Sequence, residues 1–188
     1  MRQRVLLSLF IGVAIVQLLV PGSMIYSREM TLRNGDQVRF RTTPVDPYDP
    51  FRGRFVALDL EAATAPIPEG VKLRRGQRVY AHLGVDEAGF ATLTALSLKR
   101  PERVSFIRVR VRSIRGQTAH LRLPFDRYYL EEPVAPEAER AYRRHSRRDT
   151  RDAYITVRVR DGQTVLEELY IAGKPLLEFL AQETQPSR

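Results

Sequence analysis

The first 25 residues contain a long apolar segment. Residues 5–20 read VLLSLFIGVAIVQLLV, in which Ser8 and Gln17 are the polar interruptions, and residues 21–25 are also uncharged. As a helix, residues 5–25 extend roughly 31 Å, close to the thickness of the hydrocarbon layer of a bilayer. We therefore predict a membrane anchor over residues 1–25. The alternative is a cleaved signal peptide, but a clear A-x-A cleavage site is absent and the run exceeds the usual ~7–15 apolar residues.

Two arginines precede this segment and predict its orientation. Arg2 and Arg4 favour an amino end that stays in the cytoplasm. The rest of the chain, residues 26–188, then lies on the outer side of the membrane, in the periplasm or the extracellular space. We therefore expect a protein that crosses the membrane once.

Beyond the anchor, apolar and polar residues alternate with a period of two. In residues 107–112 (IRVRVR), the isoleucine and valines share one face of a strand and the arginines share the other, because successive side chains point to opposite sides of a sheet. Turn signals such as Arg115-Gly116 and Asp161-Gly162 separate the alternating runs and predict hairpins. Strands are predicted at residues 37–41, 55–60, 78–83, 107–112 and 155–160.

Two helices and one internal echo complete the predicted architecture. Residues 107–118 and 155–164 are similar, and each reads as strand, glycine turn and return strand. Residues 136–152 suit a helix with early glutamates and later arginines, whose thin apolar face predicts an exposed or partly mobile excursion. Residues 176–183 read as a short amphipathic helix. The fold class is thus mainly β (β-rich α+β), with an N-terminal transmembrane helix, one compact antiparallel-sheet domain and one or two short helices.

Composition and motif content limit the partners, metals and cofactors that we expect for this protein. The 188 residues carry a net charge of +9, and only Lys72, Lys99 and Lys174 among the 31 basic residues are lysines, which suits anionic partners. There is no cysteine, and the three histidines are too far apart in sequence for a helix or turn to assemble a metal site. Walker, dinucleotide-binding and nucleophile-elbow motifs are absent from the sequence. We expect neither a metal nor a cofactor.

A proline-rich segment, residues 43–60 (TPVDPYDPFRGRFVALDL), leads into a predicted strand. Pro44, Pro47 and Pro50 favour a stiff, extended backbone. The carboxylates of Asp46 and Asp49 could accept hydrogen bonds from turn amides or pair with neighbouring arginines. A general acid/base pair is the alternative role for the two aspartates.

This segment resembles the bacterial GDYXXLXY family, whose members have an amino-terminal anchor, a soluble domain and no assigned activity. The resemblance extends to Glu29, Asn34-Gly35 and an aromatic segment at residues 125–132 (FDRYYLEE), so it covers nearly the whole chain. In the name-giving octet, residues 53–60, Arg54 replaces the family aspartate, and Phe55 and Leu60 replace the tyrosines. A packing role for Phe55, Leu58 and Leu60 is compatible with these changes. The motif residues are Pro44, Asp46, Pro47, Asp49, Arg52, Gly53, Phe55, Leu58 and Leu60.

The resemblance implies a bacterial membrane protein that acts as an accessory or binding protein beside an integral membrane partner. The alternating strands add candidate anion-binding arginines for an anionic polymer or lipid headgroup, provided that the two sets line one solvated sheet face. Pairing of these arginines with local glutamates is the alternative. Nucleic acid is not expected, because an anchored domain outside the cytoplasm would rarely meet it. The candidates are Arg108, Arg110, Arg112, Arg158 and Arg160.

An enzyme is the competing hypothesis and comes from a fainter similarity to type I signal peptidases. Ser23-Met24 abuts the apolar segment, and Gly35-Asp36 precedes a strand, as in those membrane-bound serine peptidases. Ser23 would be the nucleophile and Lys99 its base, since a desolvated lysine can lose its proton near neutral pH. The accessory hypothesis assigns no catalytic residue.

Overall fold

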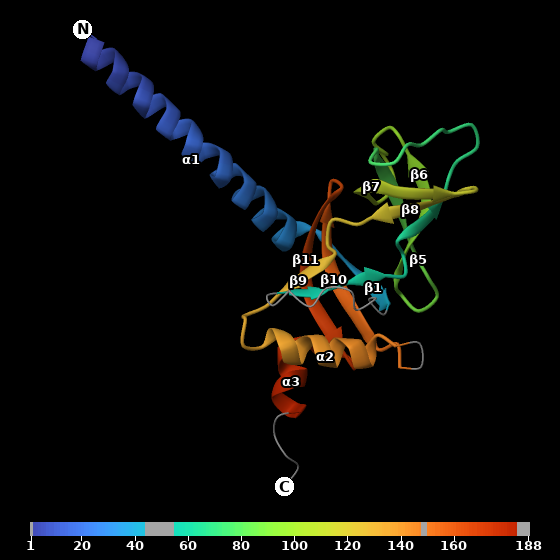
Figure 1. Ribbon diagram of the computed structural model, residues 1–188. Coiled ribbons are helices and arrows are strands. Elements are labelled where there is room, and N and C mark those ends of the chain that lie inside the picture. The colour runs from blue at the N-terminus through green and yellow to red at the C-terminus, as the bar shows by residue number, and fades with distance from the viewer. Residues whose placement is uncertain (1, 44–54, 148–149, 184–188) are drawn as a thin grey trace.

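The computed structural model describes residues 2–43, 55–147 and 150–183. A long helix, α1 (Arg2–Asn34), projects from a β-rich domain, with the amino terminus far from the sheets (Figure 1). Two five-stranded antiparallel sheets, a two-stranded ladder and two further helices form the domain. The predicted fold class is confirmed.

Residues 6–25 of helix α1 are uncharged and predominantly apolar on every side and lie outside the core. The side chains of Phe10, Leu18 and Ile25 are 70%, 73% and 70% exposed, and residues 6–34 are long and apolar enough to cross a membrane. Pro21 lies within the helix. The helix does not end at the proposed anchor boundary, residue 25, but continues without a break to Asn34.

The first sheet has the strand order β12-β11-β10-β1-β3. The alternation predicted for residues 37–41 and 155–160 is realised here: Phe40 on one strand and Ile155 and Val157 on its neighbour are fully buried. Its hairpin turns at Asp161-Gly162, both with positive φ (52° and 75°), as a two-residue turn between twisted strands requires. The strands are β1 (Asp36–Thr43), β3 (Asp59–Leu60), β10 (Ala153–Arg160), β11 (Gln163–Ile171) and β12 (Lys174–Pro175).

The second sheet has the order β4-β8-β7-β5-β6, and its hairpin β7-β8 is the counterpart of β10-β11. The internal echo in the sequence therefore corresponds to two hairpins, one in each sheet. Both inner faces contribute to a single apolar core, in which Phe40 of the first sheet packs near Phe125, with ring centroids 5.0 Å apart. The strands are β4 (Thr64–Pro66), β5 (Arg78–Val85), β6 (Ala91–Ser97), β7 (Phe106–Arg115) and β8 (Thr118–Arg122).

Two short helices lie at the end of the domain far from the amino terminus (Figure 1). Helix α3 (Leu176–Glu183) coincides with the predicted amphipathic helix. Helix α2 (Ala135–His145) corrects the expectation of an exposed excursion, because Ala138, Ala141 and Tyr142 are 0%, 0% and 1% exposed. Two small alanines let the helix approach the core closely, and the Tyr142 hydroxyl donates a hydrogen bond to the Thr43 carbonyl (3.1 Å).

The carboxyl-terminal end of α1 is docked on the β10-β11 hairpin. The hydroxyls of Ser27 and Thr31 donate hydrogen bonds to Oε1 of Gln163, at 2.7 and 3.4 Å. Gln163 immediately follows the hairpin turn, and Ser27 lies only two residues, ~3 Å along a helix axis, beyond Ile25. The hairpin turn is thus held level with the end of the apolar segment.

The turn from α1 into β1 depends on Gly35. A Cβ atom at this position would lie 2.4 Å from the Thr31 carbonyl oxygen and 3.1 Å from that of Val159. Both are backbone atoms, so neither can move aside cheaply. A residue without a side chain is therefore required where the helix meets the sheet.

We expect Gly35→Ala to lower the free energy of unfolding by about 2 kcal/mol, because the new methyl group overpacks the helix-strand junction. The measurement is the urea midpoint of the full chain in detergent. Gly12→Ala is the control, since nothing lies within 4 Å of the Cβ that it adds. Equal midpoints for the wild type and Gly35→Ala would contradict this account of the junction.

Candidate functional site

The outer face of the second sheet carries several exposed arginines. On β7, Arg108, Arg110 and Arg112 are exposed, while Ile107, Val109 and Val111 are buried, as the alternating pattern predicts. A β-bulge between Val111 and Ser113 leaves Arg112 as the extra residue in the pairing with β8. The guanidinium groups of this strand therefore face solvent, and we call this outer side of the second sheet the arginine face.

Strand register adds two arginines that the sequence interpretation missed. Arg110 lies directly opposite Arg78 of β5 on one side and Arg122 of β8 on the other. We call Arg78, Arg110 and Arg122 the arginine row. The sequence signal was present, since Arg78 and Arg122 occupy outward positions of alternating segments, but only the pairing of strands aligns them with Arg110.

The other predicted arginines belong to a different surface. Arg158 and Arg160 lie on β10 in the first sheet, so the two sets do not share one sheet face. Arg158 pairs with Glu167 (2.9 Å) and donates a hydrogen bond to the Gly35 carbonyl (3.2 Å). Arg160 donates a hydrogen bond to the Met30 carbonyl (3.4 Å). Both arginines therefore support the junction between α1 and the first sheet.

The charge of Glu167 is part of this support. Burial acts to raise its pKa, but hydrogen bonds from Arg158 and Gln37, together with the charge of Arg158, outweigh burial and hold the pKa below its ordinary value. The carboxylate is thus stabilised by the folded structure and in turn fixes Arg158 beside Gly35.

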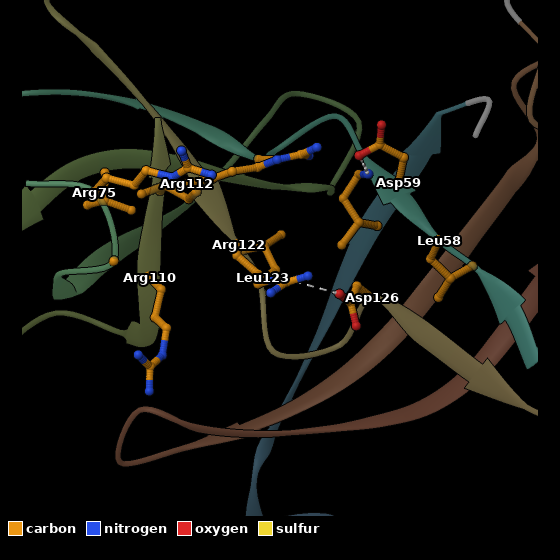
Figure 2. Close-up of a pocket in the computed structure, with 13 residues that line it drawn as sticks. Leu58, Asp59, Arg75, Arg110, Arg112, Arg122, Leu123 and Asp126 are labelled. Carbon is orange, nitrogen blue, oxygen red and sulfur yellow. Dashed lines mark hydrogen bonds and ion pairs between the residues drawn. The ribbon is translucent and has the colours of Figure 1, made fainter. Parts of the chain in front are cut away.

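A cleft lies between the family motif and the arginine face. It has a volume of about 510 Å³, and Leu58 and Asp59 lie on one side while Arg75 and Arg112 lie together on the other (Figure 2). Arg122 lies 3.8 Å from Asp126, and Arg110 points away from the other labelled arginines (Figure 2). We call this the motif cleft.

The motif itself is partly described. Leu58 and Leu60 are buried in the core, and strand β2 (Phe55–Ala57) pairs with β9 (Arg127–Tyr129), opposite Tyr129 and Tyr128. The octet and the aromatic segment, which carried the family resemblance, thus form one antiparallel ladder. The following motif positions lie outside the described residues: Pro44, Asp46, Pro47, Asp49, Arg52 and Gly53.

The peptidase candidates are not joined by a hydrogen bond within the described chain. The Ser23 hydroxyl donates to the Val20 carbonyl of its own helix at 2.7 Å, as exposed helical serines commonly do. Lys99 is exposed after β6, whereas a lysine base works from a desolvated pocket.

His82 and His145 have partners in local structure. His82 lies 3.1 Å from the Ser97 hydroxyl, and His145 lies 2.9 Å from the Asp152 carboxylate. Within residues 2–43, 55–147 and 150–183, no group of three or more histidines, cysteines or acids could hold a metal ion.

These features define a class: a β-rich protein of two antiparallel sheets, headed by a helix apolar and long enough to span a membrane. The family model for the GDYXXLXY protein matches residues 17–169, and the chain belongs to that family. No curated protein and no solved structure matches the chain.

We expect the motif to act through the packing of its leucines and not through the carboxylate of Asp59. Leu58→Ala should lower the free energy of unfolding by about 3 kcal/mol, because Leu58 is 6% exposed and a cavity would remain. Asp59→Asn, at an exposed neighbouring position, should change it by less than about 0.5 kcal/mol. Urea unfolding of both variants makes the comparison, and an equal loss for Asp59→Asn would contradict the packing role.

The Glu167 carboxylate gives a pH-dependent expectation. Because its pKa is lower in the folded chain, its contribution to stability is present above the ordinary value of 4.5 and is lost as pH falls through the folded value. Glu167→Gln should therefore lower the free energy of unfolding by about 1 kcal/mol at pH 7, with the difference vanishing in acid. Unfolding midpoints between pH 7 and 3 test this, with the exposed Glu87→Gln as control. A difference that persists unchanged at pH 3 would exclude the charge as its cause.

Proposed function

We propose that this protein is a membrane-anchored, extracytoplasmic accessory protein that binds other molecules through its β domain and acts beside an integral membrane partner. The supporting observation is the all-round exposure of the apolar residues of α1. A surface helix of a soluble domain keeps a polar face, whereas a helix that is apolar on every side suits lipid or a membrane partner.

We infer the orientation from the charges around the apolar segment, whose asymmetry is modest because Arg28 and Arg33 lie close beyond it. Arg2 and Arg4 precede it, and positive charge near a span favours the cytoplasmic side. The carboxyl-terminal domain would then lie in the periplasm or the extracellular space. Because α1 docks directly on the β10-β11 hairpin, this domain would stay close to the membrane surface, within reach of another membrane protein.

The serine peptidase remains the alternative from the sequence, and no described contact favours it. Ser23 bonds within its own helix, and Lys99 is solvent-exposed. A binding role agrees better with a domain whose distinctive polar feature is an exposed arginine face.

We expect a tag fused after Arg188 to be digested when protease is added to spheroplasts, because the domain lies outside the cytoplasm. A tag fused before Met1 is the control and should survive until the membrane is breached. A carboxyl-terminal tag that is protected until the membrane is breached would refute the orientation.

Purification of the tagged chain in mild detergent should enrich an integral membrane protein; recovery of the chain alone would count against the partner.

A further inference from the structure

We propose that a cleft beside the arginine row is a binding site for a phosphate group carried by a small ester or a lipid headgroup. This inference goes beyond the proposed function and does not depend on the orientation of the chain in the membrane. We call the site the arginine cleft. It has a volume of about 510 Å³ and is lined by Arg78, Arg108, Val109, Arg110, Arg122, Leu123, Pro124, Asp126 and Arg127.

Strand pairing forces like charges together in this cleft. Arg110 has Arg78 directly opposite on one neighbouring strand and Arg122 directly opposite on the other. Residues opposite each other on paired strands have Cβ atoms about 5 Å apart, and like charges in such pairs destabilise a sheet. The row therefore costs stability, and an arrangement that costs stability is characteristic of a site kept for binding.

The described part of the chain neutralises the row only weakly. Among the described residues that line the cleft, Asp126 is the one acid, and it lies 3.8 Å from Arg122 Nε and 3.9 Å from Arg127 Nε. Within the described ranges, the side chains of Arg78 and Arg110 make neither an ion pair nor a hydrogen bond. The donors of both guanidinium groups, which line the same cleft, are thus available to a ligand.

The donor chemistry favours phosphate. Each guanidinium presents five N–H donors in a planar fork that matches two oxygens of an anion. A single carboxylate has two oxygens, whereas a terminal phosphate has three acceptor oxygens and up to two negative charges, so it can engage several members of a row at once. Val109 and Leu123 also line the cleft, but they are 3% and 5% exposed, so their side chains belong to the apolar core below the arginines.

Arg108 connects the cleft to the membrane-proximal turn. Its guanidinium donates a hydrogen bond to the Asp161 carbonyl (3.4 Å), and its backbone N–H donates to the Gly162 carbonyl (3.2 Å). The same hairpin carries Gln163, which is bonded to Ser27. The cleft thus begins beside the end of α1 that lies next to the apolar segment, which brings lipid phosphates into consideration as well as soluble ones.

The test uses the full chain in nanodiscs of phosphatidylcholine, titrated with inorganic pyrophosphate by calorimetry. We expect saturable binding that weakens with added salt, and an affinity about tenfold or more lower for Arg110→Gln, because a charge-assisted pair of hydrogen bonds is lost. Arg147→Gln is the matched control, since it removes the same charge from an exposed position outside the cleft. It should retain the wild-type affinity.

Nanodiscs that contain phosphatidic acid, whose headgroup is a terminal phosphate, distinguish the two sources of phosphate. Suppression of pyrophosphate binding in these nanodiscs would identify the lipid headgroup as the occupant, and unchanged binding would identify a soluble phosphate ester; both results support the site. The unliganded Arg110→Gln variant should also unfold at a higher midpoint than the wild type at low salt, because a repulsive pair is removed. No response to either phosphate source, or an equal loss in Arg147→Gln, would overturn the proposal.

Discussion

The direct attachment of α1 to the first sheet is the constraint on which the arrangement of the molecule depends. A single residue, Gly35, separates the end of the helix from β1, and it permits the close approach at that point. Gln163 accepts hydrogen bonds from side chains on two successive turns of the helix. Arg158 and Glu167 hold the same junction from the neighbouring strands. The helix and the first sheet therefore behave as one unit, without the flexible linker that commonly separates an anchor from its domain.

The family motif has a corresponding role between the two sheets. Leu58 and Leu60 bury their side chains in the shared core, and the Leu58 N–H donates a hydrogen bond to the Asp126 carbonyl (3.0 Å). Since Asp126 leads from β8 into β9, the motif connects the segment after the second sheet to the edge of the first. Substitution of the family's tyrosines and aspartate is compatible with this role, because apolar contact and backbone bonding do not require those groups.

Much of this architecture follows from local sequence patterns, while the site does not. Period-two alternation located the strands at Arg78, Ile107 and Ile155, and the Asp161-Gly162 pair located a hairpin, because these signals depend on neighbouring residues. The arginine row depends on which strands pair and in what register, and Arg78 and Arg122 are 32 and 12 residues from Arg110. The burial of α2 was likewise missed, since its alanines look like a weak apolar face until another surface is found to fit against them.

The unbroken helix has a mechanical consequence. Spanning helices tilt by about 20° on average, and a helix fixed to a sheet carries that sheet with it. A change of about 20° would displace a point ~30 Å from the pivot, roughly one domain diameter, by about 10 Å. A neighbouring protein or a bilayer thickness that alters the tilt of α1 would therefore displace the second sheet, which carries the arginines. A small rotation of the helix in the bilayer would become a larger sideways movement of the domain above it.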